Sequence, residues 1–204
     1  MRAMWKRAVP AGVFVLIACW GCASPPPSIP TGEWVGQGTY IDQGYETDSG
    51  GVRKVKDDTY KPSVTITKRS IAGQEAVVFD ILSEHKPQPN SNPYVHIVMA
   101  LVRPKTLEGG SIQYDAAWAL RDSPAPRELS EAEVNKGLQE PDQPKVSCLR
   151  AGNALVMHVH YSRTREGKAF TDTLVFEGNR LYKMGHFIDP PRRISWAEQL
   201  RKVK

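Results

Sequence analysis

Residues 154–188 read ALVMHVHYSRTREGKAFTDTLVFEGNRLYKMGHFI, three strand-like segments joined by short turns. The segments cover residues 154–163, 169–176 and 180–188. The connections REGKA and EGNR, with RAGNA ahead of the first segment, are the short glycine-containing turns that close β-hairpins. Tight connections in succession make consecutive strands antiparallel neighbours. The sequence therefore predicts a meander rather than βαβ units.

Other segments extend this pattern toward the N-terminus. Residues 33–41 and 64–68 alternate between apolar and polar side chains, whereas residues 76–82 and 94–102 are nearly continuous apolar runs that predict strands covered on both faces. Residues 111–121 have the clearest period of two, with one face formed by Ile112, Tyr114, Ala116, Trp118 and Leu120. About nine strands in one domain favour a closed antiparallel barrel, with a two-sheet sandwich as the alternative.

Helical signals occur at two places. Ser130 and Glu133 form a capping-box pattern inside a proline-rich insertion over residues 123–145. Near the C-terminus, Asp189 precedes two prolines, and Ile194, Ala197 and Leu200 would share one helical face. The second pattern predicts a short helix over residues 191–202, with a final strand as the alternative.

The strand that opens the domain carries the spacing Gly32-x-Trp34-x-Gly36-x-Gly38, followed by Tyr40. Its two glycines leave a strip without side chains between two aromatic residues, where a backbone or a ligand can approach closely. This spacing resembles the first strand of lipocalin-like barrels, and of nitrobindin-type haem-binding barrels in particular. The resemblance implies a lipocalin-like barrel over residues 31–204.

Such barrels enclose small molecules, so the resemblance also implies a small apolar ligand. The candidate lining residues are Trp34, Gly36, Gly38, Tyr40, Tyr114 and Trp118. The haem-binding family carries a histidine ligand near its C-terminus. Residues 192–202 of this chain (RRISWAEQLRK) contain no histidine and offer Trp196 instead. The resemblance therefore implies the fold of this domain but not a haem cofactor, and the cofactor is unknown.

The N-terminus has the pattern of an export signal. Three basic residues precede an apolar stretch over residues 8–18, which is too short to cross a bilayer as a helix. The motif Leu16-Ile17-Ala18-Cys19 resembles the lipobox of bacterial lipoproteins, in which the cysteine is acylated, for example with palmitate, and becomes the first mature residue. The alternative is an ordinary secretory signal cut after Ala18 or Ala23.

The lipobox resemblance divides the chain into a signal peptide over residues 1–18, a proline-rich tether over residues 19–30 and the barrel domain. It implies attachment to a membrane of the bacterial cell envelope through acylated Cys19. Residue 20 is Trp rather than Asp, which favours the outer membrane if the cell is Gram-negative.

Charge and cysteine content narrow the function further. The formal net charge is +5, and removal of Arg2, Lys6 and Arg7 with the signal lowers it to about +2, too balanced for a nucleic-acid-binding protein. Of the remaining cysteines, Cys148 is expected to be a small buried apolar residue rather than the partner of Cys22 in a disulfide.

His158 and His160 are the best candidate metal ligands, because positions i and i+2 place both imidazoles on one face of a strand. The opposite face carries Leu155, Met157 and Val159, so both histidines are expected on the wetter face. No nucleophile elbow, P-loop or zinc-protease motif occurs. Three hypotheses follow: a ligand-binding lipoprotein, a structural or protein-interaction lipoprotein without a ligand, and a metal-dependent enzyme using this pair.

Overall fold

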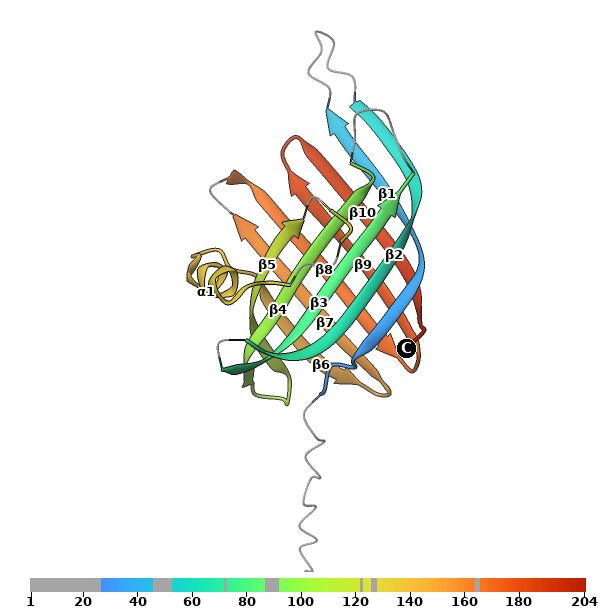
Figure 1. The fold of residues 1–204 in the computed structure, drawn as a ribbon. Helices are drawn as coiled ribbons and strands as arrows, with labels where there is room; N and C mark the ends of the chain where they lie inside the picture. The colour runs from blue at the N-terminus through green and yellow to red at the C-terminus, as the bar shows by residue number, and fades with distance from the viewer. Residues whose placement is uncertain are drawn as a thin grey trace, which may run out of the picture.

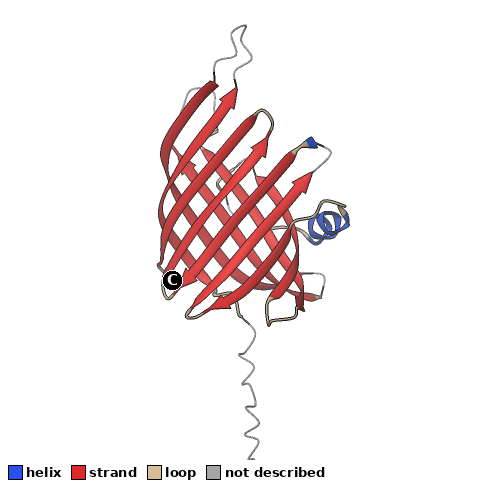
Figure 2. Ribbon diagram, turned by 180° about the vertical axis from the view of Figure 1, so that it is seen from behind, coloured by secondary structure: helices blue, strands red, loops and turns tan. Residues whose placement is uncertain are grey.

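The protein folds as a closed antiparallel barrel (Figures 1 and 2). The computed structural model describes residues 27–45, 53–71, 73–86, 92–121, 123–125, 128–163 and 166–204. Within these residues there are ten strands and one α-helix. The strands are β1 (Gly32–Tyr45), β2 (Arg53–Ile71), β3 (Gln74–His85), β4 (Tyr94–Thr106), β5 (Ile112–Arg121), β6 (Lys145–Ala151), β7 (Ala154–Arg163), β8 (Lys168–Glu177), β9 (Arg180–Asp189) and β10 (Arg192–Lys202). The helix is α1 (Glu131–Gln139).

Each strand pairs with its neighbours in the chain, and β10 pairs with β1 to close the barrel. The predicted meander is therefore confirmed, and the barrel rather than the sandwich is formed. Closure places Gly36 opposite Leu200 and Tyr40 opposite Trp196. Because the sheet is closed, no strand lies at an edge where another chain could add along its whole length.

The C-terminal segment is a strand, not the helix first predicted. Its side chains alternate, so that Ile194, Trp196, Glu198 and Leu200 share one face and Leu200 is fully buried. Glu198 occupies an inward position where an apolar residue is expected. The period of two was therefore not recognised in the sequence, and the spacing of Ile194, Ala197 and Leu200 indicated a helix. Pairing with both β1 and β9 satisfies the backbone of this segment, so the tertiary contacts decide its conformation.

One end of the barrel, called here the packed end, is filled with side chains. It is the end where β1 begins and where residues 27–31 enter the domain (Figure 1). Trp34, Phe79 and Phe176 are nearly or fully buried there, together with aliphatic residues from the other strands. The ring of Trp34 meets that of Phe176 edge-on, with centroids 5.7 Å apart. This end therefore has a core like that of any globular domain.

Strands β3, β4 and β5 are apolar on both faces, as predicted for residues 76–82 and 94–102. Their outer faces pack against α1 and its flanking segment, in a second core cluster formed by Ala76, Val78, Val98, Ala100, Val102, Ala117, Leu129 and Val134. The capping box of α1 is confirmed, since Ser130 accepts from the backbone of Glu133 and the Glu133 side chain accepts from the backbone of Ser130. The insertion is thus a cover for one side of the barrel.

A buried histidine fastens this cover to the barrel wall. His96 is 1% exposed, with Nε2 lying 2.7 Å from Oδ1 of Asp80 and Nδ1 lying 2.7 Å from the carbonyl oxygen of Ser123. Beside it, Arg121 on β5 donates to Glu133 in α1 at 3.0 Å. The carbonyl oxygen and the carboxylate oxygen thus hold the His96 ring from both sides.

No helix among the described residues is long and apolar enough to span a membrane. The predicted signal peptide, Cys19 and Cys22 lie outside the described residues. Cys148 is buried, as predicted, and burial raises the pKa of its thiol to about 12.

Candidate binding site in the open end of the barrel

Above the packed end, four polar side chains point into the barrel and form a buried cluster. They are Tyr60 on β2, Asp172 on β8, Lys183 on β9 and Glu198 on β10, all between 3% and 6% exposed. Each takes an inward position in a strand whose other inward residues are mainly apolar. A charged group in such a place is costly unless it is paired, so the contacts within this polar cluster decide whether the fold tolerates it.

Tyr60 reaches this polar cluster by crossing a whole strand. Gly38 lies between Tyr60 and Glu198 in the register of β2, β1 and β10. A Cβ atom on Gly38 would lie 2.5 Å from the ring of Tyr60, so the ring occupies the space that a side chain would take. The phenol then donates to Oε1 of Glu198 at 2.6 Å. Gly38 therefore serves internal packing, with an aromatic ring from the protein itself in its cleared space.

The same arrangement recurs two strands away. Trp196 on β10 lies across Gly185 on β9 and donates its indole N–H to Oδ1 of Asp172 on β8, at 3.2 Å. A Cβ atom on Gly185 would lie 2.6 Å from the Trp196 ring. Lys183 joins the two halves, because its Nζ lies 2.8 Å from Oε1 of Glu198 and 3.3 Å from Oδ2 of Asp172.

Burial and neighbouring charges shift the pKa values in this polar cluster. For Asp172, loss of hydration is the largest effect and Lys183 opposes it, leaving the pKa raised to about 7. Burial alone would lower the pKa of Lys183, but the two carboxylates outweigh it and raise the pKa. Burial, and then Glu198, raises the pKa of Tyr60 far above its usual value. Lys183 thus stays charged near neutrality, where Asp172 titrates.

Aromatic side chains gather beyond the polar cluster, at the end opposite the packed end. On one wall, Tyr40, Tyr60 and His85 contact one another, with the rings of Tyr60 and His85 stacked at 4.8 Å. On the other wall, Trp118 lies 5.1 Å from Tyr161 and 5.2 Å from Phe170, and Phe170 stacks on Trp196 at 5.5 Å. We call these two groups the aromatic walls, and this end the open end.

The aromatic walls differ from the packed end in their exposure to solvent. Every member except Tyr60 is only half-buried, whereas Trp34 and Phe79 at the packed end are at most 1% exposed. At the rim, Val95 and Leu120 continue the inward faces of β4 and β5, and they are 45% and 69% exposed. The open end therefore presents uncovered apolar surface within the barrel.

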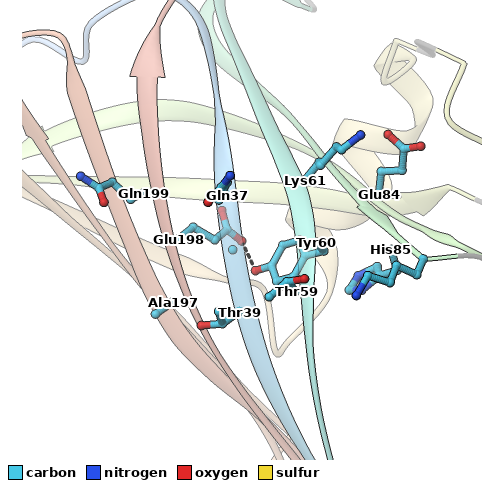
Figure 3. A pocket seen from close by; sticks show the side chains of 12 residues that line it. Gln37, Thr39, Thr59, Tyr60, Lys61, Glu84, His85, Ala197, Glu198 and Gln199 are labelled. Atoms are coloured by element: carbon cyan, nitrogen blue, oxygen red, sulfur yellow. Dashed lines mark hydrogen bonds between the residues drawn. The ribbon is translucent and has the colours of Figure 1, made fainter.

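A hollow of about 580 Å³ lies along the seam of β10, β1, β2 and β3 (Figure 3). Its lining combines the buried pair Tyr60 and Glu198 with the neighbouring residues of the same strands, namely Gln37, Gly38, Thr39, Thr59, Lys61, Glu84, His85, Lys86, Ala197 and Gln199. Figure 3 shows Glu198 and Tyr60 pointing toward each other from β10 and β2, joined by their hydrogen bond. The hollow therefore lies beside the polar cluster.

The residues predicted to line a ligand site do not all lie together. Trp34 and Tyr114 belong to the packed core, and Gly36 lies close against the backbone of β10 at Gln199. Gly38 is covered by Tyr60. Of the predicted set, Tyr40 and Trp118 belong to the aromatic walls.

His158 and His160 lie on the outer face of β7 and are exposed, as the alternation of that strand predicted. His158 contacts Thr173 at 3.2 Å, and Thr171 stands opposite both His160 and His186 in the sheet register. In the described part of the chain, no three histidine, cysteine, aspartate or glutamate residues are grouped so as to hold a metal ion. A metal at this pair stays a prediction.

Sequence reasoning missed the polar cluster. Asp172, Lys183 and Glu198 each occupy an inward position, where strict alternation places an apolar residue. That break in three neighbouring strands was the available signal, together with Gly185 in the middle of β9. Because charged residues usually mark the solvent face, their alignment inside the barrel emerges only from the register of β8, β9 and β10.

No protein-family model matches this chain. No curated protein sequence matches it either. Among solved structures, the crystal structure of Rv2717c from M. tuberculosis is similar, with 12% sequence identity and a TM-score of 0.47, over 85% of this chain and 92% of that one. A likeness of this size carries no argument about function.

Proposed function

We propose that this protein binds a small apolar molecule in the open end of its barrel while acylated Cys19 holds it at the cell envelope. The observation that carries the binding proposal is the pair of aromatic walls, which remain half-buried in a barrel whose other end is filled. Uncovered aromatic surface inside a concave structure is the usual lining of a small-molecule site. The polar cluster forms the floor of this site.

Native mass spectrometry of the full chain, extracted from its own envelope fraction, tests the binding proposal. We expect a retained mass that unfolding releases. The variant Trp118→Ala should lose it, because Trp118 connects Tyr161 and Phe170 in one wall. The matched control Met184→Ala, a 54% exposed residue of β9, should keep it. An empty wild-type barrel, or a mass that Trp118→Ala retains, would contradict the proposal.

The anchoring proposal rests on residues 16–19 and has its own test. Cells given labelled palmitate should incorporate it into the wild-type protein and into Cys22→Ser, the matched control. The Cys19→Ser variant should remain unlabelled and accumulate with its signal uncut. Label in Cys19→Ser, or none in the wild type, would exclude acylation at this position.

The filled packed end favours a second candidate, a structural or protein-interaction lipoprotein without a ligand. There the interior side chains occupy the lumen and leave mainly the outer face for partners. An empty barrel in the mass spectra would favour this candidate.

A further inference from the structure

The polar cluster contains two carboxyl groups and one ammonium. Asp172 and Glu198 both face Lys183, so the fully ionised cluster has one excess negative charge. Glu198 also has a buried oxygen, Oε2, that lacks a hydrogen-bond partner among the described residues, although its side chain is only 1% exposed. Burying a hydrogen-bond acceptor without a partner destabilises the folded state. When both carboxyl groups are ionised, the polar cluster therefore lacks a positive charge, and Oε2 lacks a donor.

Among the described residues, no side chain around the polar cluster donates to Oε2 of Glu198. The phenol of Tyr60 and the ammonium of Lys183 both bind the other oxygen of Glu198, Oε1. The indole N–H of Trp196 goes to Asp172. Gly38 and Gly185 let the rings of Tyr60 and Trp196 cross a strand, which positions two of these donors. A bound molecule or a water would supply the missing donor to Oε2.

The position of Glu198 connects it to the proposed binding site. In the closed register, Glu198 lies opposite Gly38, one inward position below Tyr40 and Trp196. It also lines the hollow beside β1 (Figure 3). A group that approaches Oε2 from the open end would pass between aromatic rings, whose faces attract cations. The indole of Trp196 already has the ammonium of Lys183 at 5.4 Å from its centroid.

We propose that the molecule bound in the open end is an amine, whose protonated nitrogen donates to Oε2 of Glu198 while its apolar body lies against the aromatic walls. This inference rests on the proposed binding function and specifies the class of ligand. A primary or secondary ammonium fits better than a quaternary one, because only the former has an N–H to donate. It also fits better than a neutral alcohol, because it balances the excess carboxylate.

The charges in the polar cluster also predict how amine binding depends on pH. The groups that face Glu198 are Tyr60 from β2, Lys183 from β9 and Asp172 from β8, and His85 from β3 stacks on Tyr60. Since the pKa of Asp172 is about 7, its ionisation adds negative charge as the pH rises past neutrality. Amine binding should therefore tighten between about pH 6 and pH 8, whereas binding of a neutral analogue should not change.

Calorimetric titration of the full-length protein in lipid nanodiscs, with empty nanodiscs as the blank, tests the proposal. The probes are 2-phenylethylamine and its neutral counterpart 2-phenylethanol. We expect the wild type to prefer the amine by about tenfold or more, the scale of a hydrogen bond to a charged group. Glu198→Gln should weaken amine binding by a similar factor and leave alcohol binding unchanged. Met184→Ala, on the outer face, should bind both probes as the wild type does.

Glu198→Gln retains an oxygen that can accept from Tyr60 and Lys183, so this variant should fold, as circular dichroism will show. Equal affinity of the wild type for both probes would overturn the amine proposal but leave apolar binding intact, with water as the partner of Oε2. Equal weakening of both probes by Glu198→Gln would also overturn it. Failure of both probes to bind the wild type would count against the binding function itself.

Discussion

Gly185 shows how the interior of this barrel depends on the absence of a single side chain. A Cβ atom there would collide with the backbone oxygen of Thr171 and lie 2.6 Å from the ring of Trp196. The ring crosses this glycine to reach Asp172. Any side chain would push the ring aside and break the link between β10 and β8.

We therefore expect Gly185→Ala to lower the free energy of unfolding by about 1–3 kcal/mol, the usual cost of overfilling a packed site. The matched control is Gly44→Ala in β1, where a Cβ atom would meet nothing within 4 Å and the change should be close to neutral. Urea unfolding of both variants measures the difference. Similar midpoints for the two would show that the Trp196 crossing is not needed.

Asp172 should make stability depend on pH. Its pKa of about 7 in the folded protein lies above the ordinary value of 3.8 for an aspartate, so the folded state binds more protons between these two pH values. Stability contributed by the protonated carboxyl is complete below about pH 4, falls as the pH rises and is lost above about pH 7. The slope reaches about 1.4 kcal/mol per pH unit. The free energy of unfolding of the wild type should therefore fall between about pH 4 and pH 7, whereas that of Asp172→Asn should lack this decrease. Parallel pH profiles of the two proteins would contradict this assignment.

At the scale of elements, the insertion that carries α1 is held by two kinds of contact. Val134 and Leu129 pack on the outer faces of β3, β4 and β5, and His96 binds the segment directly through the carbonyl of Ser123. The ring of His96 also contacts Asp80 on β3 through Nε2. This histidine is therefore an anchor for the cover rather than a ligand in the barrel.

Replacing His96 with Phe removes both hydrogen bonds and leaves Asp80 without this partner. We expect amide exchange across α1 to accelerate by about tenfold, corresponding to about 1.4 kcal/mol, while exchange in β7 and β8 is retained. His158→Phe, an exposed histidine of β7, is the control and should leave α1 unchanged. Unaltered exchange in α1 of His96→Phe would mean that apolar packing alone holds the insertion.

At the scale of the whole molecule, residues 27–31 enter at the packed end, and Ile29 is buried in its core (Figure 1). An anchor at Cys19 would therefore hold the packed end toward the membrane and the open end away from it. A fluorophore on Asn153→Cys, in the turn between β6 and β7, should be quenched by spin-labelled lipid. A fluorophore on Leu120→Cys, at the rim of the open end, should not be quenched. Both proteins carry Cys22→Ser, so that the label attaches only at the introduced cysteine. Equal quenching would reject this orientation.

The sequence alone predicted the features that depend on local pattern. Period-two alternation in residues 111–121 and the glycine turns after residue 150 predicted strands and their order, because side-chain direction and turn geometry are local properties. The double-sided apolar runs of β3 and β4 predicted a cover, which α1 supplies. The capping box of Ser130 and Glu133 located that helix because its signal lies within four residues.

The polar cluster could only be decided by the tertiary structure. Tyr60, Asp172, Lys183 and Glu198 are up to 138 residues apart. The register of β8, β9 and β10 brings the last three together, and closure of β10 against β1 adds Tyr60. Pairing with β1 and β9 also makes the C-terminal segment a strand, and the ring of Tyr60 occupies the space above Gly38. The physical reason is the same in each case: burying a charge is tolerable only beside its partner, and register between distant strands determines which groups become partners.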